Sequence, residues 1–411
     1  MGIGGISVAI GILIFSPLYR KALLACVALL FFFLGMLRYE IVMHAWNLRL
    51  PRDFYGSSRT LDGYIVSSVN GERSRKVFIE TSDYGGALIT TSLYPVFSYG
   101  ERVSITGVVE DPLTQYPYRE SLWVRGAGFI MYFPQVVVKE FAFQFSVIRE
   151  LFSLREALEE KLKSLYAEPY NALADGMLFG STNGIDKSIY DAFRRSGTSH
   201  ILVLSGFNIS VVAAFLLFIL QFVFRRRYVI VGAMIGVVLF TIMTGFGAPA
   251  VRAALMALIG LLGFYTGRQY RADIALLWAV FFMLLLNPLL LRWDAGFQLS
   301  VAATLGIMFI APWIDLYSTT FIPIQFLRSM ISTTIGAQIA VLPFFVWWGV
   351  SISSWSIVAN MLVVPLVSFI MAFSALAILC AFVSHTLALV IALPAFLLMK
   401  WQIMIALYFG V

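Results

Sequence analysis

The sequence predicts a polytopic α-helical membrane protein of about ten transmembrane helices, with a small β-barrel of OB type inserted on its extracellular or periplasmic side. Three observations predict this class. Of the 411 residues, 60% are hydrophobic and only 12% are charged, about half the charged share of an average soluble domain. Apolar runs follow one another through residues 201–411, whereas residues 50–140 consist of short β-branched runs separated by Gly and Pro. Basic residues recur in loops between the apolar runs.

Two apolar runs, residues 3–17 and 22–43, open the chain and are separated by a short basic segment. The first is short for a membrane span, which takes about 20 apolar residues, and a signal peptide is its alternative interpretation. Because no basic residue precedes this run and a second run follows at once, residues 1–49 are predicted to form a transmembrane hairpin.

Residues 50–140 are predicted to form a soluble insert. Partly alternating, β-branched runs indicate strands at 63–69, 75–82, 87–94, 102–110 and in the region 127–138. Five or so short strands in a segment of this size are typical of an OB-like barrel. The insert carries nine Lys or Arg against ten Asp or Glu and is therefore about neutral.

Residues 141–200 are predicted to be connecting helices. The stretch from about 146 to 166 has helical periodicity with a charged face. It is predicted either to lie along the membrane interface or to be a solvated helix packed on the barrel.

Residues 201–411 are predicted to form the transmembrane core. It contains eight apolar runs: residues 201–224, 228–245, 250–266, 272–291, 297–312, 329–348, 354–380 and 386–410. Together with the hairpin they make about ten spans.

Basic residues fall on one side of the membrane when the spans are drawn this way. They are Arg20 with Lys21, Arg225 to Arg227, Arg268 with Arg271, and Arg328. Because cytoplasmic loops carry an excess of Lys and Arg, this side is predicted to be cytoplasmic and the insert to lie outside. The predicted location is the cell (inner or cytoplasmic) membrane.

The net charge of +7 does not by itself indicate a nucleic-acid-binding protein. Residues 201–411 hold nine Lys or Arg against three acids, and the topology explains most of this excess. Cys26 and Cys380 lie in apolar runs far apart, and no CxxC or Cys/His metal spacing occurs, so no metal or cofactor is expected. The nucleotide-binding pattern GxxxxGK followed by Ser or Thr is also absent. Any step that needs energy is therefore expected to depend on a partner or on the proton gradient.

Polar side chains within the apolar runs are the candidate functional residues, because hydrocarbon tolerates them only where they pair or face a cavity. The stretch SHILVLSGFNIS (199–210) carries several, and Gly206 permits a broken helix, which needs a protein-enclosed or watery cavity. This stretch is predicted to be a re-entrant or interrupted helix. The candidate set is His200, Ser205, Gly206, Asn208, Arg252, Arg292, Asp294, Gln298, Gln338 and Asn360.

These candidates also have purely structural interpretations. Asp294 is placed to cap the helix that follows it, with Gln298 bracing the first turn. Arg252 and Arg292 are alternatively residues that snorkel to the outer interface, and His200 is alternatively an interface residue.

Gln338 and Asn360 have the alternative role of forming hydrogen bonds between helices, which contribute about 1 kcal/mol each. Five consecutive segments carry polar groups beside Gly or Pro. This repetition favours a common function over separate packing roles.

Six blocks of the sequence resemble the signature of the ComEC competence family, in the family's order. They are SHILVLSGFNISVVAAFLL (199–217) with ALADGMLFGSTNGIDKSIYDAFRRSGT before it, APAVRAALMALIGLLGFYTGR (248–268), NP (287–288), DAGFQLS (294–300), AQIAVLPFF (337–345) and AN…VVPL (359–366). In the insert, YGERVSITGVVEDP followed by YRESLWVRGAGFI is similar to the family's extracellular OB domain. The resemblance covers nearly the whole chain.

The resemblance implies a polytopic inner-membrane protein of natural transformation that passes one strand of incoming DNA into the cytoplasm. The implied partners are single-stranded DNA, membrane lipid, an external DNA receptor and a cytoplasmic helicase-like ATPase. Carried over residue by residue, it points to His200, Ser205, Gly206, Arg252, Asp294, Gln298, Gln338 and Asn360. After Ser-Gly the family commonly has Leu-His or a similar pair, whereas this chain has Phe207-Asn208. The role of a second histidine is therefore missing or taken by the amide of Asn208.

Many family members carry a further soluble domain that resembles metallo-β-lactamases and is credited with degrading the other strand. Such a site needs a histidine-rich metal cluster, and this sequence has three histidines, His44, His200 and His385, without an HxHxD run. No hydrolytic metal centre can be built from them, so the chain is predicted not to be an enzyme. Any nuclease step is expected from a separate protein, or the chain is a shortened form.

The function predicted from the sequence is an inner-membrane channel for single-stranded DNA. A strand is a polyanion with stackable bases. Arg252 and Arg292 are expected to contact its phosphates, and Trp293 and Phe297 to offer stacking surfaces. Two other functions stay open, namely a secondary transporter of a small solute and a membrane scaffold that binds a partner through the OB-like domain.

Overall fold

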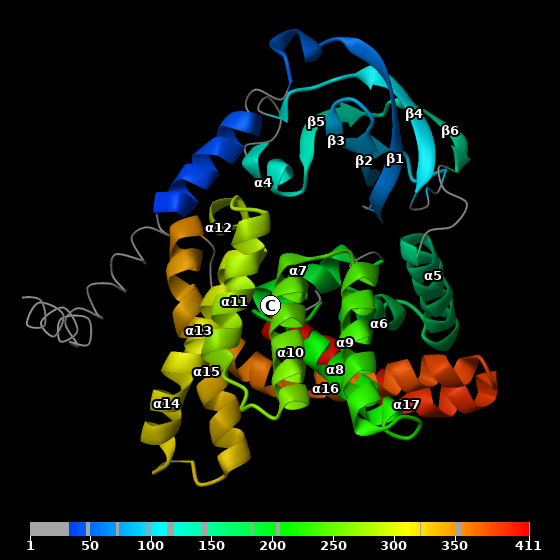
Figure 1. The fold of residues 1–411 in the computed structure, drawn as a ribbon. Coiled ribbons are helices and arrows are strands. Elements are labelled where there is room, and N and C mark those ends of the chain that lie inside the picture. The colour runs from blue at the N-terminus through cyan, green and yellow to red at the C-terminus, as the bar shows by residue number, and fades with distance from the viewer. Residues whose placement is uncertain are drawn as a thin grey trace, which may run out of the picture.

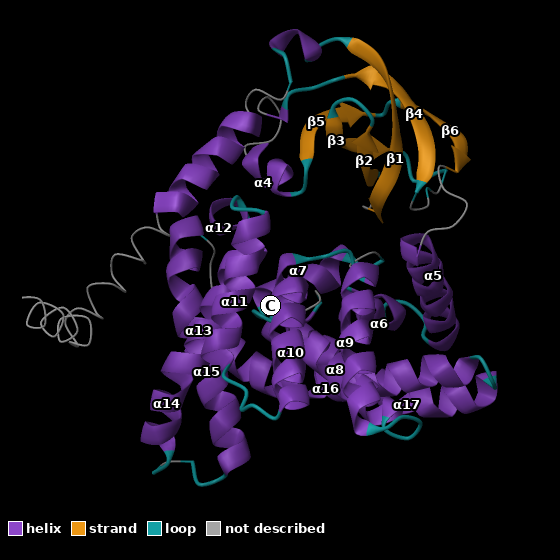
Figure 2. Cartoon of the chain, in the orientation of Figure 1, coloured by secondary structure: helices purple, strands orange, loops and turns teal. Residues whose placement is uncertain are grey.

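The computed structural model has a sheet-bearing domain at one end of a helical part (Figure 1, Figure 2). The residues it describes are 33–46, 50–70, 74–95, 97, 100–112, 119–141, 147–181, 184–202, 206–320, 322–349 and 355–410. Of the predicted N-terminal hairpin, the run 3–17 lies outside the described residues. Of the second run, 22–43, residues 22–32 also lie outside them, and residues 33–43 belong to a helix that continues to residue 46.

The helix of residues 33–46 contacts both parts of the molecule. The guanidinium of Arg38 donates a hydrogen bond to the carbonyl of Leu285, and the indole of Trp293 donates to the Tyr39 hydroxyl over 3.0 Å. At the other end, Trp46 stacks on Trp123 of α4 (Arg119–Val124), with ring centroids 5.8 Å apart. These contacts fix the helix between the sheet domain and the helical part.

Six strands form one sheet in the order β5-β3-β2-β1-β4-β6. Their bounds are β1 (Ser58–Asn70), β2 (Arg75–Thr81), β3 (Gly85–Thr91), β4 (Glu101–Val108), β5 (Ala127–Tyr132) and β6 (Gln135–Phe141). Neighbouring strands pair antiparallel, except β3 and β5, which pair parallel. The strands fall on the predicted β-branched runs. The region 127–138 divides into two strands at Phe133, whose φ of 46° turns the chain before Pro134.

The sheet bends through β1, which pairs with β4 along its first half and with β2 along its second. The register shifts between Ile65 and Ser67, and such a bulge bends a strand. In the described residues, β4 and β5 are joined by an isolated bridge in which Glu110 and Ile130 exchange backbone hydrogen bonds of 2.8 and 3.2 Å. The sheet does not close through a continuous ladder, so the OB-type barrel stays a prediction.

An apolar core lies against one face of the sheet. Alternate residues of β2 are buried, as the period of two in a strand requires. Phe54, at the end of the 3₁₀ turn η1 (Arg52–Phe54), is fully buried. Its ring lies 4.5 Å from that of Tyr84 and 5.3 Å from that of Phe129, measured between centroids. The domain therefore has a core of its own.

The helical part runs from α5 to α17. The bounds are α5 (Val147–Leu165), α6 (Tyr170–Phe179), α7 (Lys187–Arg195), η2 (Ser199–Ile201), α8 (Gly206–Leu220), α9 (Arg226–Met243), α10 (Ala248–Thr266), α11 (Ala272–Leu286), α12 (Leu290–Trp293), α13 (Ala295–Leu305), η3 (Gly306–Ile310), α14 (Ala311–Ser318), α15 (Gln325–Trp348), α16 (Ser356–Ala381) and α17 (His385–Phe409).

In the described part of the chain, six segments are long and apolar enough to cross a membrane. They are α9, α10, the continuous run α13–η3–α14, α15, α16 and α17, while α8 and α11 are shorter apolar helices. All eight apolar runs predicted after residue 200 fall on these helices. The class of a multi-pass membrane protein with a sheet-bearing insert is thus confirmed, and the number of ten spans is not.

The amphipathic helix α5 belongs to the helical part, where it packs against α6, α9 and α16. Its apolar face buries Leu162 and Leu165. On its charged face, Arg155 pairs with Glu159 at 2.6 Å and donates a hydrogen bond of 3.0 Å to the carbonyl of Met243. Burial against three helices therefore positions α5.

The helices α16 and α17 form a long antiparallel pair that lies crosswise to α9 and α10 (Figure 1). Ala377, Ala388 and Ala392 are buried at 2% exposure or less where the two helices meet. Small side chains of this kind let helix backbones approach closely. The hydroxyl of Tyr166, just after α5, lies 3.1 Å from that of Ser374 and ties the pair to the rest of the helical part.

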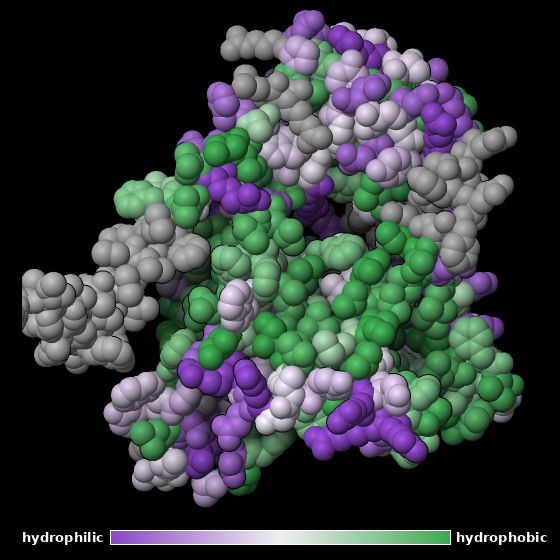
Figure 3. Space-filling model, viewed as in Figure 1, coloured by the Kyte–Doolittle hydropathy of each residue, from purple (hydrophilic) through white to green (hydrophobic). Residues whose placement is uncertain are grey.

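The loops α8–α9, α10–α11 and α14–α15 lie at the end of the helical part away from the sheet (Figure 1). The first carries Arg225 to Arg227, the second carries Arg268 and Arg271, and Arg328 follows the third. Figure 3 shows hydrophilic residues gathered at this end, below a hydrophobic middle band. The basic loops of the described residues therefore share one side, as predicted, while Arg20 and Lys21 lie outside the described residues.

Candidate functional site

The turn between α7 and η2 positions His200. Ser196 and Thr198 are fully buried, and their hydroxyls lie 2.8 Å apart. Gly197 between them has φ of 75°, and a Cβ there would lie 2.5 Å from the Cβ of Ser356 in α16. This close approach requires glycine. The side chain of His200 is exposed, while Ile201 after it is buried.

Two further candidates meet this turn from other helices. The amide of Asn360 in α16 donates to the carbonyl of Gly197 over 3.5 Å, and the amide of Gln338 in α15 donates to the Ser356 hydroxyl over 3.2 Å. The Asn360 Oδ1 is buried without a partner. The structure thus brings Gln338 and Asn360 to the turn that carries His200, and we name Gly197, Gln338, Ser356 and Asn360 the turn cluster.

A second group forms where α8, α10 and α13 meet. Gly206 begins α8, and a Cβ on it would lie 2.9 Å from Nη2 of Arg252. The Arg252 guanidinium donates to the hydroxyl of Thr304, which itself donates to the Ser300 carbonyl over 2.8 Å. Arg252 is only 7% exposed, and its Nε has no partner in the described residues. We name Gly206, Arg252 and Thr304 the arginine cluster.

Asn208 extends this region toward α6. It is 1% exposed, and its Nδ2 donates a hydrogen bond of 2.9 Å to the carbonyl of Met177. Ser205 lies outside the described residues. The start of α8 is therefore tied to both α6 and α10, after the separate 3₁₀ turn η2.

The remaining candidates, Arg292, Asp294 and Gln298, lie together at the turn from α12 to α13. The Asp294 carboxylate accepts a hydrogen bond of 2.6 Å from the Phe297 amide, which confirms that it caps α13. The Gln298 amide donates to the carbonyls of Leu291 and Arg292, both at 2.8 Å, and so ties α13 back to α12, whereas the brace was expected within the first turn of α13. Its Oε1 is buried without a partner.

The two aromatic residues expected to stack on bases, Trp293 and Phe297, differ in accessibility. Arg292 is exposed, and its guanidinium lies 4.8 Å from the centre of the Trp293 ring. Phe297 is 2% exposed, so the expectation that its ring is available for stacking is wrong in this structure. The apolar side of α13 is packed into the helical part, and Phe297 belongs to that side.

Among the described residues, the candidates fall into the turn cluster, the arginine cluster with Asn208 beside it, and the α12–α13 turn. A pocket of about 270 Å³ lies between α14 and α15 and a smaller one of about 30 Å³ lies between α5 and α6, and none of the ten candidates lines either. The arginine cluster and the α12–α13 turn adjoin each other, because Gly296 in α13 lies against Pro249 in α10. A common hydrated path through them stays a prediction.

Asp175 in α6 is a titratable group that the sequence prediction missed. Its Oδ1 is buried without a partner, and it lines the smaller pocket together with Glu159, Lys163 and Glu168. Burial, and then the negative charge of Glu159, raise its pKa to about 7. The signal was visible, since Asp175 is the one acid in the apolar helix YNALADGMLF.

Asp175 lies close to the first residues of the predicted transmembrane core, 201–411. Its neighbour Gly176 packs so tightly that a Cβ would lie 2.6 Å from the carbonyl of Leu202, and Met177 accepts the Asn208 hydrogen bond. Asp175 therefore lies on the helix that contacts both Leu202 and Asn208. Among the described residues, no group of three or more His, Cys, Asp or Glu side chains is placed to hold a metal ion.

The fold and these contacts define a multi-pass membrane protein in which polar side chains tie several apolar helices together beneath a sheet-bearing domain. Residues 177–410, more than half of the chain, match the model of the Competence protein family. The chain belongs to that family. The matched region contains all ten candidate residues.

Two curated proteins are each similar to more than half of the chain. ComE operon protein 3 of Bacillus subtilis (strain 168) is 24% identical over 221 residues, which are 54% of this chain and 28% of that protein. The uncharacterized protein YcaI of Escherichia coli (strain K12) is 27% identical over 240 residues, which are 55% of this chain and 31% of that protein. The similarity thus spans less than a third of either relative. No solved structure matches the chain.

Proposed function

We propose that this chain is the inner-membrane channel that passes single-stranded DNA into the cytoplasm during natural transformation. The observation that carries the proposal is the match of residues 177–410 to the Competence protein family, together with the similarity to ComE operon protein 3. The matched region holds the polar contacts described above. The proposed role is transport without catalysis.

The arginine cluster is the proposed phosphate contact of the channel. Arg252 is a buried cation between three apolar helices, and its Nε lacks a partner in the described residues. A strand's phosphates would supply that partner, because Lys and Arg contacts to phosphate dominate nucleic-acid binding. Because Gly206 lies close to Arg252, the proposal requires α8 and α10 to separate when a strand passes.

The sheet domain is proposed to be an OB-like module on the outer side of the membrane. The bent β1, the parallel pairing of β3 with β5 and the bridge between Glu110 and Ile130 support a nearly closed barrel. Its place opposite the basic loops supports the orientation. The proposed partners are a DNA receptor outside, a helicase-like ATPase inside, and a separate nuclease.

A secondary transporter of a small solute is the second candidate. The observation that favours it is the carboxyl of Asp175, because a pKa near 7 suits a group that binds and releases protons. Such a carrier does not need a route for a strand. Strand entry that is unchanged when the protein is absent would favour this function.

Uptake of labelled DNA tests the channel directly. A strain that lacks the protein is expected to bind DNA at its surface but to lose entry of the strand into the cytoplasm. Arg252→Gln should reproduce that loss at a normal protein level in the membrane. Arg268→Gln, which changes an exposed arginine of a basic loop, is the matched control and should keep strand entry. Normal entry with Arg252→Gln would remove Arg252 from the path.

A further inference from the structure

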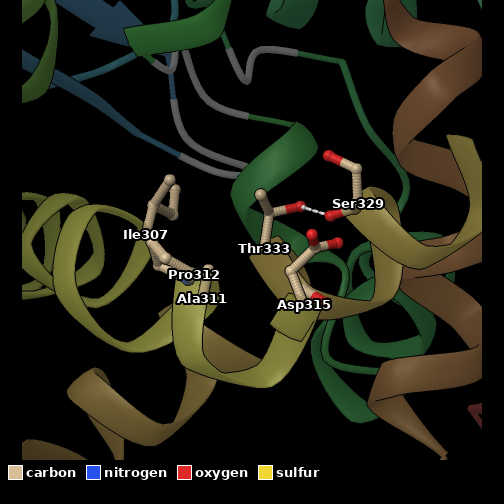
Figure 4. A pocket seen from close by; sticks show the side chains of 7 residues that line it. Ile307, Ala311, Pro312, Asp315, Ser329 and Thr333 are labelled. Atoms are coloured by element: carbon tan, nitrogen blue, oxygen red, sulfur yellow. Dashed lines mark hydrogen bonds between the residues drawn. The ribbon is translucent and has the colours of Figure 1, made fainter. Parts of the chain in front are cut away.

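The larger pocket lies between α14 and α15 and is half polar. Ile307, Ala311 and Pro312 form an apolar wall on η3 and α14, and Asp315 faces across to α15 (Figure 4). The lining residues of α15 all carry hydroxyl groups: Ser329, Ser332 and Thr333. The pocket measures about 270 Å³, which is room for about nine waters at roughly 30 Å³ each.

The pocket is built by a specific helix crossing. Gly306 and Gly336 touch so closely that a Cβ on Gly306 would lie 2.2 Å from the Gly336 carbonyl. Beyond this contact, α14 and α15 run on toward the loop that joins them, and the pocket lies in this stretch. The π-helical turn η3 (Gly306–Ile310) widens the chain here, and such turns are frequent at functional sites.

The polar wall has acceptor atoms without partners. The Ser332 hydroxyl is buried, with the residue 1% exposed, and makes no hydrogen bond in the described structure. Asp315 accepts a 3.0 Å bond from Nε of Arg328 at one carboxylate oxygen, and its other oxygen has no partner among the described residues. Thr333 donates to the carbonyl of Ser329 over 2.8 Å and keeps its acceptor lone pairs.

The position of the pocket is that of a membrane–water interface. It lies at the end of the helical part where the basic loops gather (Figure 1, Figure 3). Trp313 and Tyr317, close to its lining residues, are exposed. Trp and Tyr are enriched at the level of lipid headgroups. Phe309 and Leu316, apolar residues of the same helices, are also exposed, as residues that contact lipid would be.

We propose that the pocket binds the headgroup of a phospholipid that carries a primary ammonium group, as ethanolamine lipids do. The three N–H donors of that ammonium match the three acceptors of the polar wall, on Asp315, Ser332 and Thr333. Arg328, bound to Asp315, adjoins the pocket and gives the lipid phosphate a cation beside the carboxylate.

The chemistry separates this ligand from others. A choline headgroup has a trimethylated nitrogen with no N–H to donate, and a glycerol headgroup has no cation for Asp315. The carboxylate and guanidinium together are neutral, so the pocket suits a zwitterion better than an anionic lipid. A bare metal ion would fill only a small part of the volume.

Lipid binding to the purified full chain tests the proposal. Protein freed of lipid in detergent is mixed with phosphatidylethanolamine, phosphatidylcholine or phosphatidylglycerol with identical acyl chains, and bound lipid is counted by native mass spectrometry. The ethanolamine lipid should bind at least about tenfold more tightly than the other two, because hydrogen bonds to a charged group are lost with them.

Two variants assign that preference to the pocket. Ser332→Ala removes the unpartnered hydroxyl without touching the Asp315–Arg328 pair, and Asp315→Asn removes the charge. Both should weaken binding of the ethanolamine lipid, Asp315→Asn by about 10- to 100-fold. Asp273→Asn is the control, because Asp273 forms an exposed pair with Arg271 at the same end of the molecule. It should keep the preference.

Equal binding of the three lipids by the unmodified protein would overturn the proposal, as would an unchanged preference in both pocket variants. Free phosphoethanolamine is tested last, as a competitor of the lipid. It should compete weakly, because it lacks acyl chains. If it binds as tightly as the lipid, the pocket belongs to a soluble ligand and the lipid assignment is wrong.

Discussion

Replacing Asp175 by asparagine is expected to stabilise the protein at pH 8. The pKa of this carboxyl is raised from 3.8 to about 7 in the folded chain, because it is buried and lies near Glu159. Between these two values the folded state holds a proton that the unfolded state has released. Stability therefore falls as pH rises from about 4 to about 7, and the loss is complete above the folded pKa. Asparagine carries no such penalty.

The magnitude follows from the shift. A difference of about 3 units at about 1.36 kcal/mol each sets an upper limit of about 4 kcal/mol. Asp175 keeps some exposure, and the pocket beside it measures about 30 Å³, enough for about one water. We therefore expect about 2 kcal/mol.

Thermal unfolding of the purified full chain in detergent, measured from pH 5 to pH 8, is the assay. The Asp175→Asn variant should unfold at a higher temperature than the unmodified protein at pH 8, and the gap should narrow at pH 5. Asp186→Asn is the control, because Asp186 is exposed before α7 and makes no capping bond with its side chain. A gap that does not change with pH, or a less stable Asp175→Asn variant at pH 8, would refute this reasoning.

Three further predictions concern the contacts between helices, each read as an unfolding temperature in detergent. Asn208→Leu should cost about 1–3 kcal/mol, because it leaves the buried Met177 carbonyl without its bond; an unchanged temperature would contradict that bond. Gly197→Ala should destabilise the protein more than Gly245→Ala. Both glycines have positive φ, but only at Gly197 would the added Cβ lie within 3 Å of another helix. Asp294→Ala should cost about 1 kcal/mol while Asp294→Asn retains the cap, and equal losses would contradict capping.

The sequence predicted the helices and one local contact well, because both depend on residues near each other in the chain. Apolar runs of membrane length mark the helices whatever their packing. The cap at Asp294 forms with the amide of Phe297, three residues away, so residue type and spacing were sufficient.

The contacts between helices were not predictable in the same way. Arg252 bonds to Thr304, which is 52 residues away, and Asn208 to Met177, which belongs to a different helix. The hydrophobic periodicity of α13 is weak, so it did not show that Phe297 would be buried. The raised pKa of Asp175 results from its burial and from the nearby charge of Glu159. Both depend on how the helices pack, which the sequence does not show.

The sheet shows the same division. Its strands follow the β-branched runs, whereas the bulge in β1 and the single bridge between β4 and β5 depend on how the whole sheet curves. Whether a barrel closes is a property of strand tilt and register together. The runs alone predict the strands and leave closure open.

Crosslinking of a strand in transit tests the central claim most directly. A photo-reactive amino acid in place of His200, whose exposed side chain follows the turn cluster, is placed in cells taking up labelled DNA. The same amino acid in place of Phe309, an exposed apolar residue of η3, is the control. A DNA crosslink at position 200 and none at position 309 is the result that a channel through the helical part predicts. Equal labelling at both positions, or none at position 200 while DNA still enters, would contradict it.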